Sequence, residues 1–423
     1  MKQVLFVSYY FPPQPEAGAV RAGALAQHLP EFGWLPTVIS LAAGSPPPYA
    51  GPVLAAPNLL IPAPAPIRPP LTADAAPASV PRRRSLRERI PRRIRRAYWS
   101  STQLHFPDPA MGWILPALAA GRRALAHGHF HAVISSAHPP SAHLVAAALA
   151  RRAKLPWIAD YRDLWTGYPY SRKSSARQCL ERRLERATVR HADAITTVSP
   201  ALGEELRALF PAQRVIVIPN GVDLVAHAGA PSQTPNGFRI VYAGQLYGGR
   251  RTPEALFAAV RNLRKRGEPA GSAIALDFYG GEEPVVDALA DRYGIGDAVR
   301  AFPRVDRESV LLAQRRAALL LVLLSLDPAT ANEYGSKLFE YVGAGRPVLA
   351  IGPAASVVRD YLSESGLGSF AWDAASCERA LLGAYERFVR GEYAPQLVPG
   401  WTPFTTRDLA ERFARTLAEI EGP

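Results

Sequence analysis

The stretch that decides the fold is Glu333–Gly352, EYGSKLFEYVGAGRPVLAIG. Its first half predicts a helix that opens at Gly335 and Ser336 and ends at Gly345, because glycine often follows the last turn of a helix. The apolar run PVLAIG that comes next is typical of a buried strand in a parallel sheet. A helix that leads directly into such a strand is the repeating unit of an α/β fold.

The same alternation of strands and helices extends in both directions along the chain. It begins with the strand VLFVSYY at residues 4–10, and a second set begins with FRIVYAG at residues 238–244. We therefore predict an N-terminal Rossmann-like domain over 1–225 and a C-terminal one over 238–395. Residues 396–423 hold a last helix, which we expect to pack back on the first domain. The default site is the cleft across which two such domains face each other.

Composition agrees with two cores and suggests an anionic partner. The chain has 423 residues, of which 48% are hydrophobic. A chain of this length is expected to form two domains, each with its own hydrophobic core. Its formal net charge of +13 favours nucleic acid, anionic lipid or a phosphate-bearing substrate. Two distant cysteines, Cys179 and Cys377, have no zinc-ligand spacing and suit a reducing compartment. The N-terminus lacks the pattern of a signal peptide, and no window predicts a membrane span, so we expect a cytoplasmic protein.

A Pro- and Ala-rich excursion is predicted over residues 44–100, and it carries a strongly basic run. Arg82–Arg96, RRRSLRERIPRRIRR, contains nine arginines and one glutamate. It is either a stretch that binds an anionic membrane surface, at the inner face, or a solvated surface run. We expect no nucleic-acid partner, because no helix-turn-helix or RNA-binding signature is present.

The helix at residues 335–345 carries the first candidate binding groups. Free backbone N–H groups at Gly335 and Ser336 suit a diphosphate, and Lys337 adds a cation in the first turn. Glu340 lies one turn further on, where it can accept hydrogen bonds from ribose hydroxyls. The alternative is a surface helix with an i, i+3 pair of Lys337 and Glu340.

A glycine-rich loop follows the strand that opens the second domain. The segment VYAGQLYGGRRTPEAL, residues 241–256, contains Gly244, Gly248 and Gly249, which permit close approach to the backbone. Arg250 or Arg251 can neutralise a phosphate there. The alternative is a tight turn with exposed arginines.

Two segments of the first domain carry further candidates. In the first loop, FPPQPEAGAVRAGALAQHL, Gly18 would bring the backbone near the sugars, and Arg21 would bind either phosphate or an acidic neighbour. In SSAHPPSAHLVAAALARRAKLPWIADYRDLW, His138 and His143 are candidates near the reacting centre, or else core residues. Asp163 lies at a strand's carboxyl end, where it would orient an acceptor hydroxyl or act as a base. We expect Asp160 and Arg162 of the same segment to form a structural ion pair.

These motifs, in order from Tyr9 to about Pro353, together resemble family 4 glycosyltransferases, which have the GT-B fold. The resemblance is to the subgroup whose donor helix contains S-K-x-F-E-Y followed by A-G-x-P-V-L-A. The family often has a first Glu eight positions before the second. Here that position is Asn332, and the nearest Glu is Glu333.

The resemblance implies a retaining transfer of a sugar from a nucleoside diphosphate sugar to a hydroxyl of a glycan or lipid-linked, cell-envelope acceptor. It implies that Arg250, Arg251 and Lys337 stabilise the leaving diphosphate without a metal cofactor, and that Glu340 binds the ribose. His143 is the histidine that best matches the family position. A sugar-nucleotide epimerase and an inactive sugar-nucleotide-binding or membrane-surface protein remain the alternatives.

Overall fold

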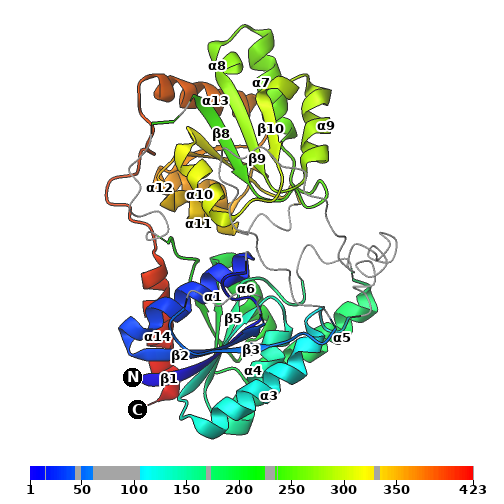
Figure 1. The fold of residues 1–423 in the computed structure, drawn as a ribbon, viewed down its shortest axis with the longest axis vertical. Coiled ribbons are helices and arrows are strands. Elements are labelled where there is room, and N and C mark those ends of the chain that lie inside the picture. Colours follow the sequence, from blue (N-terminus) through cyan, green and yellow to red (C-terminus); the bar gives the residue numbers. More distant parts are fainter. Residues whose placement is uncertain are drawn as a thin grey trace, which may run out of the picture. The chain divides into compact units, whose positions relative to one another are not determined.

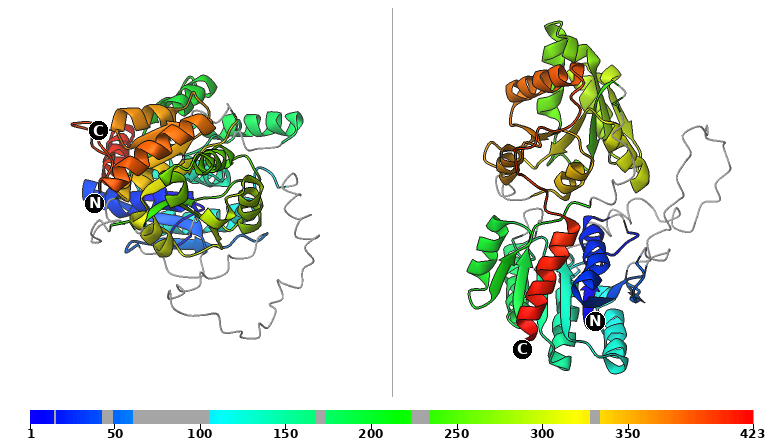
Figure 2. Two further views of the ribbon diagram at one scale, coloured as in Figure 1. Left: turned by 90° about the horizontal axis from the view of Figure 1, so that it is seen from above. Right: turned by 90° about the vertical axis from the view of Figure 1, so that its left-hand side faces the viewer.

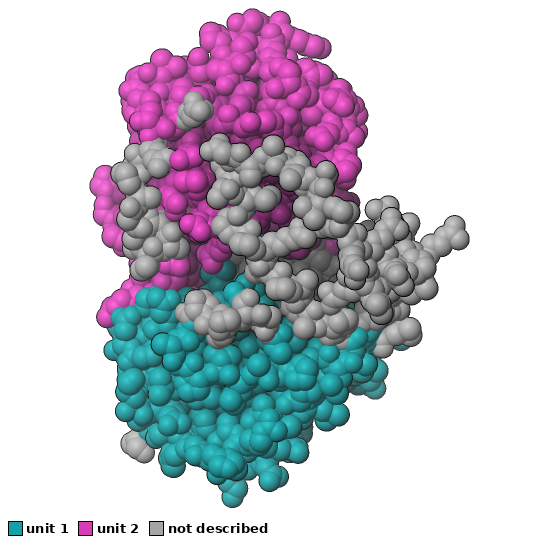
Figure 3. Space-filling view, viewed as in Figure 1, with its two compact units in different colours: residues 1–218, 409–423 teal, residues 219–408 magenta. Residues whose placement is uncertain are grey.

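The computed structural model describes residues 1–14, 16–42, 49–60, 105–167, 173–223, 234–235, 237–327 and 334–422, without the side chains of Ala17 and Ser336. The chain divides into two compact units, which Figure 3 colours separately. Unit 1 comprises Met1–Ile218 and Leu409–Pro423, and unit 2 comprises Pro219–Asp408. Arg82–Arg96 and Glu333, both singled out in the sequence, lie outside the described residues.

Unit 1 is built on a sheet of seven parallel strands in the order β3-β2-β1-β4-β5-β6-β7 (Figure 1). Its strands are β1 (Lys2–Ser8), β2 (Trp34–Leu41), β3 (Val53–Ala56), β4 (Ala132–Ala137), β5 (Trp157–Tyr161), β6 (Ala194–Thr197) and β7 (Arg214–Val217). Its helices are α1 (Ala17–His28), α3 (Met111–His127), α4 (Ser141–Ala153), α5 (Ser175–Val189) and α6 (Pro200–Leu209), with a 3-10 turn η1 (Leu29–Phe32).

The central strand β1 of unit 1 is buried from Val4 to Val7 and carries apolar side chains on both of its faces. Leu5 and Val7 of β1 belong to a core cluster that also contains Trp113 of α3 and Leu149 of α4. Neighbouring residues of a strand point to opposite faces, so Phe6, which is fully buried, packs on the other side of the sheet.

The last helix, α14 (Thr406–Glu421), packs on unit 1 alongside α1, as Figure 2 shows. Phe413 is fully buried, and the Arg21 guanidinium of α1 lies 5.4 Å from the centre of its ring. At the far end, Lys2 Nζ and Glu421 Oε2 form an ion pair at 2.6 Å, which brings the two chain termini together. The C-terminal segment is therefore part of the first core.

Unit 2 is built on six parallel strands in the order β10-β9-β8-β11-β12-β13. Its strands are β8 (Phe238–Ala243), β9 (Ile274–Tyr279), β10 (Val299–Phe302), β11 (Leu319–Leu323), β12 (Val348–Ile351) and β13 (Gly368–Ala371). Its helices are α7 (Glu254–Lys265), α8 (Pro269–Ala273), α9 (Glu283–Tyr293), α10 (Arg307–Arg316), α11 (Ser336–Gly343), α12 (Val357–Ser365) and α13 (Ala374–Val389), with a 3-10 turn η4 (Gly296–Ala298).

The two faces of β8 bury different helices. Ile240 and Tyr242 belong to a cluster with residues of α7, α9 and α13, whereas Val241 and Ala243 belong to a cluster with Leu338 of α11 and residues of α12. This alternation is what a strand covered on both faces requires.

The strand orders confirm the prediction of two α/β domains with parallel sheets, and they also indicate where a ligand would bind. In each sheet the order reverses once, between β1 and β4 in unit 1 and between β8 and β11 in unit 2. Open α/β sheets bind ligands outside the carboxyl ends of the strands at this reversal. The loops that follow these four strands are therefore the expected positions of ligand-binding residues. In the described parts of the chain, no helix is long and apolar enough to cross a membrane.

Candidate functional site

In unit 2, helix α11 is attached to the end of β8 through one buried side chain. The backbone N–H of Ala243, the last residue of β8, donates to the Tyr341 hydroxyl at 2.9 Å. Tyr341 and Leu338, three positions apart, are fully buried on the same face of the helix. Burial holds the pKa of Tyr341 well above its ordinary value, so the hydroxyl stays neutral. This contact attaches α11 to the end of β8, directly before the glycine-rich loop that begins at Gly244.

Next to this buried face, α11 presents a charged pair, Lys337 and Glu340. Lys337 Nζ lies 3.2 Å from Glu340 Oε1, and the same oxygen accepts from Gln314 Nε2 of α10 at 2.6 Å. Arg307 Nη2 lies 3.9 Å from the other oxygen, Oε2. Burial raises the pKa of Glu340, but Lys337, Gln314 and Arg307 outweigh it and hold that pKa below its ordinary value. The Glu340 carboxylate is therefore ionised, and its Oε1 already accepts hydrogen bonds from Lys337 and Gln314.

The start of α11 fits an anion better than a side-chain cap. Gly335 is the N-cap residue and makes no side-chain hydrogen bond to the helix. The described first turn contains no acidic residue, and its cation is Lys337. A Cβ added to Gly335 would meet no atom of the described residues within 4 Å, so their packing leaves room beside the helix N-terminus. Free backbone N–H groups at such a position bind phosphate groups.

The glycine-rich loop is a left-handed turn. Tyr247, Gly248 and Gly249 have φ values of 51°, 66° and 88°. The N–H groups of Gly249 and Arg251 both donate to Leu246 O, at 3.1 and 3.0 Å. Within the part of the chain that the structure describes, no atom lies within 4 Å of a Cβ built on Gly248 or Gly249, so the positive φ is what makes glycine suitable here.

The two arginines of this loop are half-buried and differ in their surroundings. The Arg251 guanidinium lies 4.8 Å from the centre of the Tyr247 ring, in cation–π geometry. Burial raises the pKa of Tyr242 to about 12 although the positive charge of Arg251 opposes this rise. The carbonyl of Arg250 accepts from Leu326 N at 3.3 Å, which attaches the loop to the segment after β11. Both side chains thus remain candidates for neutralising a phosphate.

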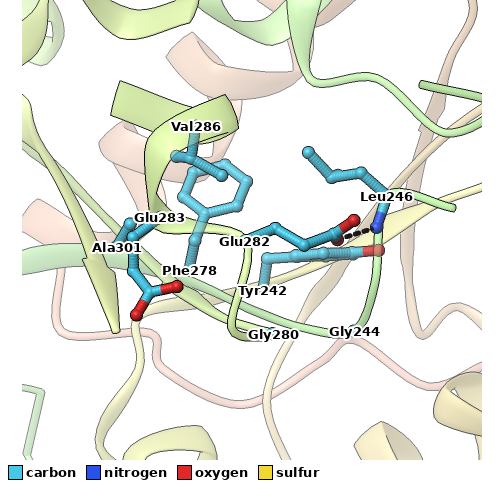
Figure 4. A pocket seen from close by; sticks show the side chains of 9 residues that line it. All are labelled: Tyr242, Gly244, Leu246, Phe278, Gly280, Glu282, Glu283, Val286 and Ala301. Carbon is cyan, nitrogen blue, oxygen red and sulfur yellow. Dashed lines mark hydrogen bonds between the residues drawn. The ribbon is translucent and has the colours of Figure 1, made fainter. Parts of the chain in front are cut away.

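A small hollow, lined among others by Tyr242, Leu246 and Glu282, lies beside the same loop at the carboxyl ends of β8 and β9. Figure 4 shows Glu282 pointing to the backbone N–H of Leu246, with which it forms a hydrogen bond. A Cβ on Gly280 would lie 2.1 Å from Gly244 O, so only glycine permits the two loops to meet. The sequence analysis did not identify Glu282 as a candidate residue. The segment GGEEP, which directly follows a predicted strand, could have indicated it.

In unit 1, Arg21 is part of a buried ion pair with Asp160. Its Nε and Nη2 lie 3.1 and 3.0 Å from the two carboxylate oxygens, and Nη2 also donates to Ile218 O at 3.0 Å. Asp160 accepts in addition from the hydroxyls of Ser136 and Thr196, at 2.9 and 2.8 Å. Of the two alternatives for Arg21, the structure shows the acidic neighbour. The predicted ion pair of Asp160 with Arg162 was wrong, because Arg21 occupies both carboxylate oxygens.

Arg162 instead occupies the space that Gly18 leaves free. Its Nε donates to Ser136 Oγ at 3.1 Å, and its Nη2 donates to His138 O at 2.6 Å. A Cβ on Gly18 would lie 2.4 Å from Arg162 Nη1. The absence of a side chain at Gly18 therefore accommodates a guanidinium group of the protein, where we had expected a sugar.

His138 and Asp163 lie together at the carboxyl ends of β4 and β5. His138 Nδ1 is 3.8 Å from Asp163 Oδ2, and the two side chains are 28% and 41% exposed. Burial raises the pKa of Asp163, but His138 and the charge of Arg162 outweigh it and hold that pKa below its ordinary value. Asp163 is thus an ionised, accessible carboxylate beside an accessible histidine.

His143 lies in the core of unit 1, so the catalytic position predicted for it needs correction. It is fully buried, its Nδ1 is 2.7 Å from Ser135 Oγ, and its ring centre is 4.7 Å from that of Tyr161. Burial lowers its pKa to about 3, so the ring is neutral near pH 7. A substrate cannot touch this side chain in the observed conformation.

A second buried acid, Glu185 of α5, organises the loop after β5. It accepts from the Tyr161 hydroxyl at 3.1 Å, and from the backbone N–H and the hydroxyl of Thr166. Burial raises the pKa of Glu185 to about 7, although the hydrogen bonds from Thr166 and Tyr161 oppose this rise. Thr166 follows Asp163 by three residues, so Glu185 stabilises the loop that presents Asp163.

We expect Glu185→Gln to make the free energy of unfolding rise more steeply with pH than in wild type between about pH 5 and 7. In this range native Glu185 keeps its proton while the unfolded chain, with a pKa near ~4.3, has lost it. The contribution of Glu185 to stability therefore falls as the pH rises, by up to about 3 kcal/mol, and the difference in stability between wild type and variant should shrink with it. Urea unfolding at a series of pH values measures this slope, with the exposed Glu386→Gln as control. Equal slopes in wild type and Glu185→Gln would contradict the prediction.

With this geometry established, similarity to known proteins defines the class of the chain. Residues 18–225 match the family model described as Glycosyltransferase Family 4. The match begins within α1 and extends through β2 to β7 of unit 1, whereas β1 and α14 lie outside it. The prediction that the chain is a glycosyltransferase enzyme is thereby confirmed. The S-K-x-F-E-Y subgroup stays a prediction, because α11 lies outside the matched residues.

Solved structures of low identity share the fold over the whole chain. Sucrose-phosphate synthase from Thermosynechococcus elongatus has 16% identity and a TM-score of 0.59, covering 100% of this chain and 95% of its own. The HepE protein of Anabaena, in complex with UDP and glucose, has 16% identity and a TM-score of 0.56, covering 99% of both chains. A putative UDP-N-acetylglucosamine 2-epimerase from Listeria monocytogenes has 13% identity and a TM-score of 0.54, covering 100% and 98%.

These likenesses confirm the predicted GT-B fold with its two α/β domains. No curated protein sequence matches the chain at a significant level.

Proposed function

We propose that this protein is a retaining glycosyltransferase that moves a sugar from a nucleoside diphosphate sugar to a hydroxyl acceptor. The observation that carries the proposal is the arrangement at the strand-order reversal of unit 2. There Lys337 and the ionised Glu340 lie on the first turns of α11, and Tyr341 attaches this helix to the end of β8, where the glycine-rich loop begins. A cation, free helix N–H groups and a carboxylate acceptor match the diphosphate and ribose of one ligand.

In this proposal the donor diphosphate lies at the N-terminus of α11. The backbone at Gly335 and Ser336 and the Lys337 ammonium group bind it, and Arg250 or Arg251 adds a second cation from the loop. These charges stabilise the negative charge that develops on the diphosphate as the glycosidic bond breaks, so no metal ion is required. Glu340 accepts from the ribose hydroxyls. The similarity to HepE, solved with UDP and glucose, makes UDP the first nucleotide to test.

The acceptor hydroxyl is proposed to meet Asp163 and His138 of unit 1. The bond between the anomeric carbon and the phosphate oxygen breaks, and the acceptor oxygen bonds to the same face of that carbon. The acceptor proton passes to an oxygen of the leaving β-phosphate, so a protein base is not obligatory. Asp163, which is ionised and accessible, orients the hydroxyl.

The acceptor is proposed to be a glycan or lipid-linked sugar of the cell envelope. The net charge of +13 and the nine arginines within 82–96 support a protein that works at the inner face of an anionic membrane. Binding to vesicles with and without anionic lipid, at low and high salt, tests this part separately.

The decisive experiment is a panel of UDP- and GDP-sugars, with and without lipid-linked acceptors, in which release of nucleoside diphosphate is followed. Acceptor-dependent release that disappears in Glu340→Ala and persists in the exposed control Glu386→Ala would support the transferase. Conversion of the donor sugar without any acceptor would favour an epimerase, a class that shares this fold. Donor binding without turnover would indicate an inactive binding protein.

A further inference from the structure

Gln314 is a buried amide whose hydrogen bonding is incomplete. It lies on α10, it is fully buried, and its Nε2 donates to Glu340 Oε1 at 2.6 Å. Among the described residues, its own carbonyl oxygen Oε1 is buried and has no hydrogen-bond partner. A buried polar atom without a partner lowers stability, so packing alone would favour an apolar side chain at this position.

The effect of Gln314 is best seen on Glu340. Gln314 and Lys337 both donate to Glu340 Oε1, so they restrict rotation of the carboxylate. The second oxygen, Oε2, has only Arg307 nearby, at 3.9 Å, and no hydrogen bond within the described part of the chain. Because Gln314 is neutral, it orients the carboxylate without cancelling its charge.

We propose that Gln314 is a positioning residue that presents Oε2 of Glu340 to the ribose hydroxyls of a nucleoside diphosphate. The proposal rests on the proposed function, since it gives Glu340 the ribose as its ligand. Gln314 does not touch the ligand itself, because its side chain is fully buried.

The proposal predicts a change in the pH dependence of nucleotide binding. Glu340 is faced by Lys337 and Tyr341 of its own helix, and by Gln314 and Arg307 of α10. Its burial favours the neutral acid, and the hydrogen bond from Gln314 is one of the contacts that oppose this. A carboxylate that accepts from hydroxyls supports binding above its pKa and loses this effect as the pH falls through it. Removing Gln314 raises that pKa, so affinity is lost at a higher pH.

The test compares wild type with Gln314→Met, which keeps the volume and removes the amide. Calorimetric titration with UDP, GDP and their 2′- and 3′-deoxy analogues is run between pH 4.5 and 8, and thermal midpoints are recorded. Wild type should prefer the ribose form by roughly tenfold, since hydrogen bonds to a charged group are strong. In Gln314→Met we expect this preference to shrink, the midpoint of acid loss to move to higher pH, and the thermal midpoint to stay or rise.

Two further variants separate positioning from packing. Glu340→Gln should lose the ribose preference at every pH, and Gln178→Met, an exposed change on α5, should behave as wild type. A Gln314→Met protein with wild-type ribose preference and pH midpoint overturns the inference, and so does one that loses only thermal stability.

The outcomes for wild type also distinguish this inference from the proposed function. If wild type binds a nucleoside diphosphate but ignores the ribose hydroxyls, the inference fails while the transferase proposal stands. If wild type binds none of these nucleotides, both fail.

Discussion

Replacing Lys337 with alanine is expected to lower kcat for sugar transfer by about 10²–10³-fold, the effect of removing one fixed donor from a developing negative charge. Lys337 is the cation of the described first turn of α11, at the helix end where phosphate groups bind. Its charge acts most strongly when the diphosphate departs, so the loss should fall on kcat and kcat/KM together. Steady-state kinetics with the donor identified by the sugar panel measure this.

The control variants separate the proposed effect of Lys337 on the diphosphate from its contact with Glu340. Lys337→Arg keeps the charge and should retain more activity than Lys337→Ala. Lys265→Ala, an exposed change at the end of α7, should leave kcat unchanged. Lys337 also lies 3.2 Å from Glu340, so ribose discrimination must be measured in the same variants. A raised KM with an unchanged kcat would contradict a role in the departure of the diphosphate and would indicate ground-state binding only.

The sequence was informative where a motif is local. The run S-K-L-F-E-Y predicted the start of α11 and the neighbouring positions of Lys337 and Glu340, because helical spacing alone brings i and i+3 together. For the loop with Gly248 and Gly249 the sequence left a tight turn open as the alternative, and both glycines do have positive φ. The periodicity of apolar runs also predicted parallel sheets in both units, since strands covered on both faces are apolar throughout.

The sequence was least informative where partners come from distant segments. Gln314 contacts Glu340 from a separate helix, 26 positions away. The residues next to Gln314 in the sequence form no motif that would indicate a function for its amide. The sequence suggested an acidic neighbour for Arg21 and paired Asp160 with Arg162. Only the fold shows that Arg21 is the arginine that binds Asp160. Charge complementarity predicts that an ion pair forms, but packing decides its partners.

Both units attach their candidate groups to the sheet by buried polar contacts. In unit 2, Tyr341 connects α11 to the end of β8. In unit 1, the Arg21–Asp160 pair connects α1 to β5, next to the loop that carries Asp163. A buried contact of this kind restricts where the neighbouring loop can go, which a precise arrangement of reacting groups requires.

The second large effect is expected from Arg21→Met, which should destabilise unit 1 by about 3–5 kcal/mol. Among the described residues, the change leaves the fully buried Asp160 carboxylate with the hydroxyls of Ser136 and Thr196 as its donors, and a buried charge without a counter-charge is what makes such losses large. Urea unfolding at pH 7 measures the loss. Arg21→Met combined with Asp160→Leu removes both charges and should recover much of it.

The pH dependence of this loss identifies its cause. In wild type, burial raises the pKa of Asp160, but the charge and hydrogen bonds of Arg21, with those of Thr196 and Ser136, hold it below its ordinary value. The pair therefore stabilises the fold above the unfolded pKa of ~3.9, and this contribution disappears as the pH falls through the folded value. In Arg21→Met the pKa of Asp160 rises instead, and the variant gains stability on acidification while the carboxyl takes up its proton. The gap between wild type and variant should hence be smaller at about pH 4.5 than at pH 7. A gap that does not change with pH would mean that Arg21 stabilises the unit through its packing on Phe413 and not through its charge.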